Sequence, residues 1–233
     1  MQCWKGPLPS PDIRTIGDMR LVLAAPSCSE TGPLYSMYRD LARTPEDRAW
    51  LSRHSLRYDI TIISSRTLCG EYAKTKGHYH PAAPSGIGYP ELYQVLEGKA
   101  HYLLQTRDHS DVILVQAEAG DFILVPPSYG HVTINPGPSD LVMANMVSSA
   151  FTSDYRDYEQ LRGGAFYEMS DGRMIRNPAY DHVSPLRSFH AADIGHRMGF
   201  SCDALYDLVG GGELLFLNFP ERYPDLFRVY QGD

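Results

Sequence analysis

Two histidines and a glutamate lie close together in the chain and are able to do metal chemistry. His78 and His80 are one residue apart, and Glu91 follows a segment rich in glycine and proline. Side chains two residues apart on an extended strand point to the same face, so both imidazoles can reach one point. If residues 81–90 return the chain, Glu91 comes to lie beside them. The alternative is that the three are unconnected polar residues in a surface loop.

A fourth candidate ligand, His131, follows a later run of β-type residues. Taken alone, it is more often a surface or core residue than a ligand. Three imidazoles and one carboxylate together form a mixed nitrogen and oxygen site with open positions, which suits Fe(II), Mn(II), Ni(II) or Zn(II). The residue types therefore predict a divalent metal site without thiolate ligands.

Short β-type runs separated by turn residues must position these groups. Seven such runs follow one another with no helical pattern between them: YDITIISS, ELYQVLEG, AHYLLQT, DVILVQ, DFILVPP, HVTINPG and DLVMANMVSS. Their spacing predicts an antiparallel all-β sandwich or barrel, because a parallel α/β fold would need intervening helices.

Helices and less regular segments flank these strands. The stretch 44–56 predicts a helix with Thr44 as its cap and Pro45 in its first turn. A second helix is expected over 154–161, followed by a hairpin that turns at Asp171 and Gly172. The expected organisation is an N-terminal arm, a main domain, and an apolar C-terminal extension that packs on the barrel or on a partner subunit, with bounds 1–33, 34–180 and 181–233.

Composition limits the classes of function. The net charge is −7 with no run of Lys and Arg, so we expect no nucleic-acid partner. No stretch of 18 or more apolar residues and no signal-peptide pattern occurs, so we expect no membrane partner and a cytoplasmic location. The four cysteines, Cys3, Cys28, Cys69 and Cys202, are scattered, and we expect free thiols in a reducing compartment.

The spacing of the candidate ligands resembles the two motifs of the cupin superfamily. HxH and the pattern ExxxxxxG, from Glu91 to Gly98, match the first motif, which supplies His, His and Glu. GxxxxxP, from Gly120 to Pro126, followed by His131, matches the second. The interval between the HxH pair and Glu91 is longer than usual, and Ser128 replaces a glycine. The resemblance implies an all-β cupin barrel, a double-stranded β-helix or jelly roll, with the arm, a few helices and the extension around it.

Within the cupins, the chain is most similar to the cupin-type glucose-6-phosphate isomerases. The strings TKGHYH, ELYQVLEGKA, LLQT and VPPSYGHVTIN carry this resemblance, which covers residues 34–178. It implies a homodimer that acts on a sugar phosphate with one divalent ion per subunit, Fe²⁺ as first choice and Mn²⁺, Ni²⁺ or Zn²⁺ as alternatives. The implied metal ligands are His78, His80, Glu91 and His131. The implied substrate contacts are Tyr35, Thr61, Thr75, Lys76, Gly77 and Tyr93.

Several of these substrate contacts have simpler interpretations. Thr61 suits a strand, Tyr35 and Tyr93 suit a barrel core, and Lys76 suits a solvated surface. The chain also departs from the family downstream of the last strand, where Val147 and Ser153 stand in place of a typical Tyr and His. The preference between glucose 6-phosphate and mannose 6-phosphate stays open.

The resemblance implies aldose–ketose isomerisation through a cis-enediol, with Glu91 as the catalytic base. A hydride shift between C1 and C2 is the alternative route. Two other functions keep the barrel: a non-catalytic sugar-phosphate-binding cupin and an Fe(II) cupin dioxygenase. Hydroxyl-bearing pocket residues favour a sugar over an apolar substrate.

Overall fold

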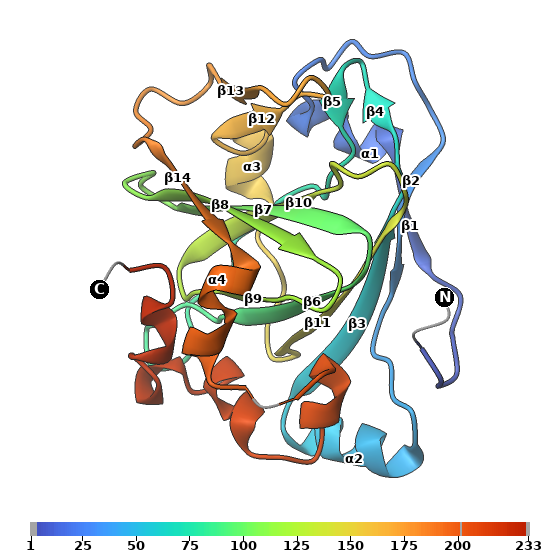
Figure 1. The fold of residues 1–233 in the computed structure, drawn as a ribbon, viewed down its shortest axis with the longest axis vertical. Coiled ribbons are helices and arrows are strands. Elements are labelled where there is room, and N and C mark those ends of the chain that lie inside the picture. The colour runs from blue at the N-terminus through green and yellow to red at the C-terminus, as the bar shows by residue number, and fades with distance from the viewer. Residues whose placement is uncertain (1–3, 201, 232–233) are drawn as a thin grey trace.

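The computed structural model describes residues 4–200 and 202–231, and its main feature is two facing β-sheets (Figure 1). One sheet has six strands in the order β1-β2-β3-β11-β6-β9, and the other has four in the order β10-β7-β8-β14. Two small two-stranded sheets, β12-β13 and β4-β5, lie at one end. The expected all-β cupin architecture is confirmed.

The bounds of the elements are as follows. The six-stranded sheet contains β1 (Asp12–Thr15), β2 (Pro33–Tyr38), β3 (Leu56–Ile63), β6 (Glu91–Glu97), β9 (Phe122–Val125) and β11 (Leu141–Ser148). The four-stranded sheet contains β7 (Lys99–Thr106), β8 (Val112–Glu118), β10 (Tyr129–Ile134) and β14 (Leu186–His190). The short strands are β4 (Thr67–Leu68), β5 (Glu71–Tyr72), β12 (Phe166–Glu168) and β13 (Met174–Arg176). The helices are α1 (Ile16–Met19), α2 (Pro45–Arg53), α3 (Arg156–Gln160) and α4 (Ala191–Ile194), and the 3-10 helices are Arg20–Val22, Gly195–Met198, Leu205–Leu208, Glu213–Leu217, Pro220–Arg222 and Leu226–Arg228.

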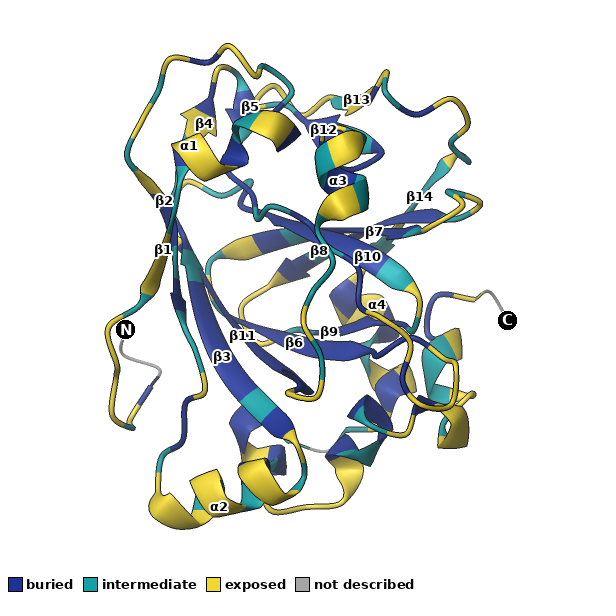
Figure 2. Cartoon of the chain, turned by 180° about the vertical axis from the view of Figure 1, so that it is seen from behind, coloured by how far each residue is buried: buried dark blue, intermediate teal, exposed yellow. Residues whose placement is uncertain are grey.

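All seven β-type runs of the sequence form strands, because their alternating residues pack between the two sheets. Figure 2 shows the central strands of both sheets almost entirely buried. Five strands were not expected: the short strands β1, β4 and β5, and the longer strands β2 and β14. Pro33 opens β2 directly after a glycine, and β14 has no clear apolar alternation, so local signals were weak at both places.

The expected helix at 44–56 is α2. The Thr44 hydroxyl accepts a hydrogen bond from the Asp47 amide at 3.1 Å, and Pro45 occupies the first position. Leu51 is buried against the barrel, while most of the helix surface is exposed (Figure 2). The second expected helix is α3, and the hairpin after it is β12-β13.

The expectation of free thiols is wrong for two cysteines. Cys28 and Cys69 form a disulfide, with their Cα atoms 5.8 Å apart, which ties the N-terminal arm to the turn between β4 and β5. The pair is separated by 41 residues, so only the tertiary fold brings it together. Cys202 is a free thiol, as expected, and Cys3 lies outside the described residues.

Both flanking segments join the barrel. In the N-terminal arm, β1 pairs antiparallel with β2, and in the C-terminal extension, β14 pairs parallel with β8. Leu214, Phe216 and Leu217 of the extension are fully buried in the core that the six-stranded sheet also contributes to. The Tyr206 hydroxyl accepts a hydrogen bond from the Arg43 amide at 2.6 Å. The extension therefore covers the barrel beside α2 and β9 (Figure 1).

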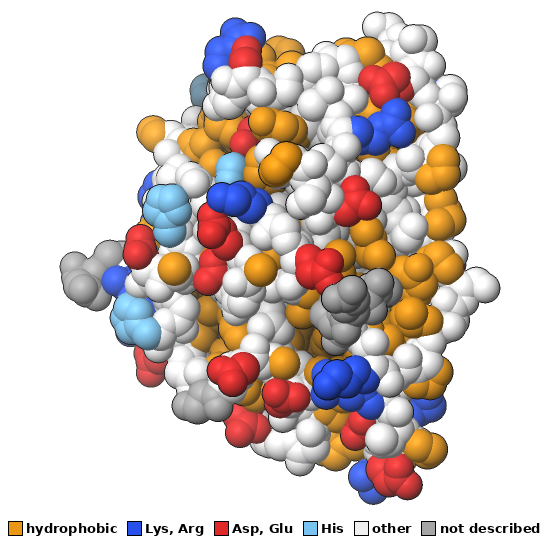
Figure 3. All heavy atoms as spheres, turned by 45° about the vertical axis from the view of Figure 1, so that its right-hand side comes forward, with side chains coloured by type: hydrophobic (Ala, Val, Ile, Leu, Met, Phe, Trp, Pro, Cys, Tyr) orange, Lys and Arg blue, Asp and Glu red, His pale blue; other side chains and the backbone are white. Residues whose placement is uncertain are grey.

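On the face shown in Figure 3, Lys and Arg side chains are scattered among Asp and Glu and form no continuous basic stripe. Within residues 4–200 and 202–231, no helix has the length and apolar character needed to cross a membrane.

Candidate metal centre and substrate pocket

The four predicted ligands come from three parts of the barrel and converge on one point. Glu91 begins β6 and His131 lies in β10. His78 and His80 do not lie in a regular strand, which corrects the expectation. They lie in an extended segment held by isolated bridges, in which His78 and His131 exchange backbone hydrogen bonds of 3.3 and 3.1 Å.

The approach to this segment requires a glycine. Gly77 has φ of +79°, and a Cβ there would lie 2.6 Å from the ring of Tyr158. A side chain at this position would push the two histidines away from β10, so the glycine of the TKGH string has a steric reason.

Side-chain atoms of the four residues lie within 4.8 Å of one another. The Nε2 atoms of His78 and His80 are 3.2 Å apart. Glu91 Oε2 lies 3.3 Å from Nε2 of His80 and 3.3 Å from Nε2 of His131. One oxygen and three nitrogens thus surround a common centre.

The electrostatics favour neutral imidazoles. Burial, together with the neighbouring histidines, holds the pKa of His78 well below its usual value. Burial also lowers the pKa of His131 to about 4, although the charge of Glu91 opposes this shift. His80 Nδ1 lies 2.9 Å from the Tyr89 carbonyl oxygen, an arrangement in which Nδ1 donates and Nε2 keeps its lone pair toward the centre.

One buried atom points directly to a cation. Glu91 Oε2 is buried and accepts no hydrogen bond from the described residues. Burial acts to raise the pKa of Glu91, but contact with His80 and the proximity of His131 lower it below its usual value. A buried oxygen that stays ionised needs a positive partner. The four residues therefore fit a divalent metal ion.

Two further residues orient this cluster. The Asn145 amide donates to Glu91 Oε1 at 2.7 Å, which leaves only Oε2 facing the centre. The Tyr93 hydroxyl lies 3.0 Å from His131 Nε2, and burial raises the pKa of Tyr93 well above its usual value, so it stays protonated. Tyr93 was expected as a substrate contact, and it lies beside His131, a predicted metal ligand, on the wall of the same pocket.

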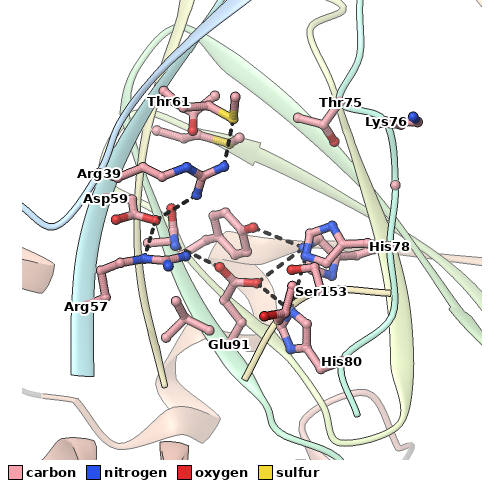
Figure 4. Close-up of a pocket in the computed structure, with 18 of the residues that line it drawn as sticks. Arg39, Arg57, Asp59, Thr61, Thr75, Lys76, His78, His80, Glu91 and Ser153 are labelled. Carbon is pink, nitrogen blue, oxygen red and sulfur yellow. Dashed lines mark hydrogen bonds and ion pairs between the residues drawn. The ribbon is translucent and has the colours of Figure 1, made fainter. Parts of the chain in front are cut away.

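The other expected substrate contacts line this pocket too: Tyr35, Thr61, Thr75, Lys76 and Gly77. The Thr75 hydroxyl accepts a hydrogen bond from the Thr133 amide at 2.9 Å, and the Tyr35 hydroxyl accepts one from the Lys76 amide at 3.4 Å. The Lys76 ammonium forms an ion pair of 2.6 Å with Glu159 at the mouth of the pocket. The structure brings all the sequence-predicted residues to one cavity (Figure 4).

Six polar lining residues were missed: Arg39, Arg57, Asp59, Asn145, Ser148 and Thr152. A signal for two of them was present, because polar residues 57, 59 and 61 alternate along β3 and must therefore share the face that Thr61 presents to the pocket. Val147 and Ser153, where the chain departs from the family pattern, also line the pocket.

Two facing sheets with three histidines and a glutamate converging between them define a metal-binding cupin. The family model described as glucose-6-phosphate isomerase (GPI) matches residues 14–184. The match covers most of the chain, and the chain belongs to this family.

Individual relatives agree with this assignment. The glucose-6-phosphate isomerase of Thermococcus litoralis is 32% identical over 100 residues, which are 43% of this chain and 50% of that protein. That of Thermococcus gammatolerans is 27% identical over 128 residues, 54% of this chain and 65% of that protein. The match thus spans from half to about two thirds of the length of these relatives. Among solved structures, an oxalate decarboxylase from Bacillus subtilis is similar over 52% of this chain and 28% of its own, with 18% identity and a TM-score of 0.39.

Proposed function

We propose that the protein is a metal-dependent aldose–ketose isomerase that interconverts glucose 6-phosphate and fructose 6-phosphate. One observation carries the proposal: in a chain of the glucose-6-phosphate isomerase family, a buried His, His, Glu and His cluster opens into the pocket that Thr61 and Thr75 line. Hydroxyl groups on the pocket wall suit a sugar, which supports this activity over that of a dioxygenase acting on an apolar substrate.

The cluster of His78, His80, Glu91 and His131 would hold one divalent ion per subunit, with Fe²⁺ favoured and Mn²⁺, Ni²⁺ or Zn²⁺ as alternatives. Such an ion would act as a Lewis acid on the oxygens of C1 and C2. The neutral imidazoles would donate their lone pairs to it, and Asn145 would keep Glu91 in position.

Glu91 is the proposed base. Its Oε2 would take the proton from C2 as the C2–H electrons form the double bond of a cis-enediol and O1 takes up a proton. The Glu91 carboxyl would then return its proton to C1 on the same face as O2 gives up its proton and becomes the ketone oxygen. A hydride shift would bypass the base. Substrate deuterated at C2 distinguishes the two routes. In the proton-transfer route, the deuterium passes through the Glu91 carboxyl group and is partly exchanged with water, so the product loses part of the label. In a hydride shift, all of the deuterium moves to C1 of the product.

The phosphate would lie at the other end of the pocket, where the hydroxyls of Tyr35, Thr61 and Thr75 and the backbone N–H of Gly77 can donate hydrogen bonds. Lys76 would add a positive charge at the rim, shared with Glu159. This arrangement gives the substrate one fixed direction, with C1 and C2 toward the metal cluster.

We also propose that the protein is a homodimer and that it is cytoplasmic, a location in which the Cys28–Cys69 disulfide would be one of the uncommon intracellular ones. Support for the dimer is the exposed edge of β1, where Ile13 is 46% exposed, because such edges are commonly covered by a second subunit. Light scattering on the purified protein measures this directly.

The test of the activity is metal analysis and a fructose 6-phosphate assay on one preparation. Aldose formation is expected, and Glu91→Gln is expected to lower kcat about 10²- to 10⁴-fold. Glu97→Gln, at the exposed end of the same strand, is the matched control and should leave kcat unchanged. Tight sugar-phosphate binding without conversion would identify a non-catalytic binder instead, and metal-dependent oxygen uptake would identify a dioxygenase.

A further inference from the structure

The wall of the pocket opposite the histidines carries charges that the proposed isomerisation has not yet used. Arg57, Asp59 and Thr61 alternate along β3 and share its inner face, so Arg57 and Thr61 are separated by about 13 Å of strand. Thr61 lies at the proposed phosphate end. Arg57 therefore lies at the opposite end, where C1 and C2 would be.

Asp59 holds two guanidinium groups. Its Oδ2 accepts hydrogen bonds from Arg57 Nε at 2.8 Å and from Arg39 at 3.1 Å. Its Oδ1 accepts one from the Asp40 amide at 2.8 Å. The carboxylate is buried, and one negative charge between two positive ones leaves this wall of the pocket cationic.

Arg57 keeps more of its five N–H donors for a ligand than Arg39 does. Arg39 also contacts Asp12 at 3.3 Å through Nε and the Met37 sulfur at 3.0 Å. Arg57 uses Nε for Asp59, and its two terminal nitrogens form no hydrogen bond with any residue in the described part of the chain. Its side chain is 31% exposed and lines the pocket.

The register of the sheet places the Arg57 side chain at the end of the pocket where C1 and C2 of the substrate would lie. Across β3, β11 and β6, Arg57 lies opposite Val147, and Val147 lies opposite Glu91. Two strand spacings amount to about 10 Å. Since Val147 is short, the Arg57 side chain can extend over it, and Figure 4 shows it running from β3 toward Glu91. A large aromatic residue at position 147 would occupy this path.

We propose that Arg57, held by Asp59 and backed by Arg39, forms a second anion-binding subsite at the C1 end of the pocket. The inference rests on the proposed function for the direction of the substrate. During isomerisation, negative charge develops on the oxygens of C1 and C2, and the N–H groups of the two free Arg57 terminal nitrogens are donors already in place for it. The same subsite would bind the carboxylate of a phosphorylated aldonic acid, a class of ligand in which C1 is permanently anionic.

The experiment compares two ligands that differ only at C1. Gluconic acid 6-phosphate carries a carboxylate there, and glucitol 6-phosphate carries a neutral hydroxymethyl group. Calorimetric titration of chelator-treated, metal-free protein removes any contribution of a metal ion. We expect the acid to bind more tightly than the alditol, and Arg57→Met to reduce this preference about 10- to 100-fold. The alditol should bind both proteins equally.

Controls separate recognition from folding. Arg53→Met, on the exposed surface of α2, should leave both affinities unchanged. Arg57→Lys keeps the positive charge but cannot donate to both oxygens of a carboxylate as a guanidinium does. It should therefore keep only part of the preference for the acid over the alditol. Thermal unfolding checks each variant, and if Arg57→Met fails to fold, Arg57→Lys alone tests the claim by the same ratio.

Every outcome is decisive. Equal weakening of both ligands, or no change in their ratio, would show that Arg57 only braces β3 and would overturn the subsite. Loss of the preference in a protein that never converts fructose 6-phosphate would support the subsite and reject the isomerase. Conversion of fructose 6-phosphate with an unchanged ratio would reject the subsite and keep the isomerase.

Discussion

The two walls of the pocket handle buried polarity in opposite ways. On the histidine wall, formed by His78, His80 and His131, burial lowers the pKa values of His78 and His131, so these two imidazoles are neutral and offer lone pairs. On the arginine wall, formed by Arg39, Arg57 and Asp59, the guanidinium groups keep their protons and share one carboxylate.

This difference separates ligand binding from stability. On the histidine wall, Glu91 Oε2 is buried and accepts no hydrogen bond from the described residues. This wall therefore fits a bound cation. On the arginine wall, Asp59 is fully paired within the chain. Removing a group from the first wall should therefore cost metal binding, and removing Asp59 from the second should cost folding free energy.

The largest effect is expected on the histidine wall. His80→Ala removes one of the four proposed ligands and should reduce both bound metal and isomerase activity to background, because the remaining groups would no longer enclose an ion. Elemental analysis and the fructose 6-phosphate assay measure the two together. His182→Ala, an exposed histidine, is the control. Retention of a full equivalent of metal by His80→Ala would contradict the proposed ligand set.

A smaller effect is expected on the arginine wall. Asp59→Asn leaves two guanidinium groups without their shared anion, and should lower the free energy of unfolding by somewhat less than the roughly 3–5 kcal/mol of a fully buried pair. The expected loss of free energy is smaller than for a fully buried pair because the side chains of Arg39 and Arg57 are 37% and 31% exposed. Urea unfolding measures it.

The matched control for that change is Asp12→Asn, which removes the exposed partner of Arg39. Its side chain is 70% exposed, so the expected loss is about 0–1 kcal/mol. Equal losses for the two variants would show that burial of Asp59 does not matter, and the contrast between the walls would fail.

A subtler change tests the support of the metal cluster. Asn145→Ala removes the hydrogen bond to Glu91 Oε1 and should weaken metal affinity or activity about 10- to 100-fold, without unfolding the barrel. Competition with a chromogenic chelator measures the metal affinity. If affinity and kcat both stay at the wild-type values, Glu91 is oriented by other contacts.

The smallest effect is expected for a second aspartate–arginine pair, Asp111 with Arg187, in which the aspartate is more exposed than Asp59. Asp111 accepts two hydrogen bonds from Arg187 of β14, at 2.9 and 2.7 Å. Burial acts to raise the pKa of Asp111, but Arg187 and the Tyr129 hydroxyl lower it below the usual value. A carboxylate with a depressed pKa stabilises the fold above its unfolded pKa, and this contribution is lost as the pH falls through the folded value.

Asp111→Asn should therefore lower the free energy of unfolding by about 1 kcal/mol or less at pH 7. The difference from wild type should shrink as the pH falls below about 4, where the unfolded aspartate becomes protonated. Unfolding curves at several pH values check this. A difference that grows in acid would reverse the sign and reject the pairing as its cause.

Local sequence patterns were enough to predict much of the fold and the candidate metal ligands of this protein. Short β-type runs separated by turn residues located the seven strands, and Thr44 with Pro45 located the start of α2. The residue types at His78, His80, Glu91 and His131, together with the resemblance of their spacing to the two cupin motifs, predicted the ligand set. These signals survive without knowledge of any long-range contact.

Only the tertiary structure decided which distant residues meet. The disulfide between Cys28 and Cys69, the hydrogen bond from Asn145 to Glu91, and the sharing of Asp59 by two arginines have no local pattern. Each depends on strand order and register, in which a shift of one residue would turn the side chains to the opposite face of the sheet. The sequence was enough to predict the metal ligands, whereas the positions of Arg39, Arg57 and Asp59 on the opposite wall depend on the register of the sheet.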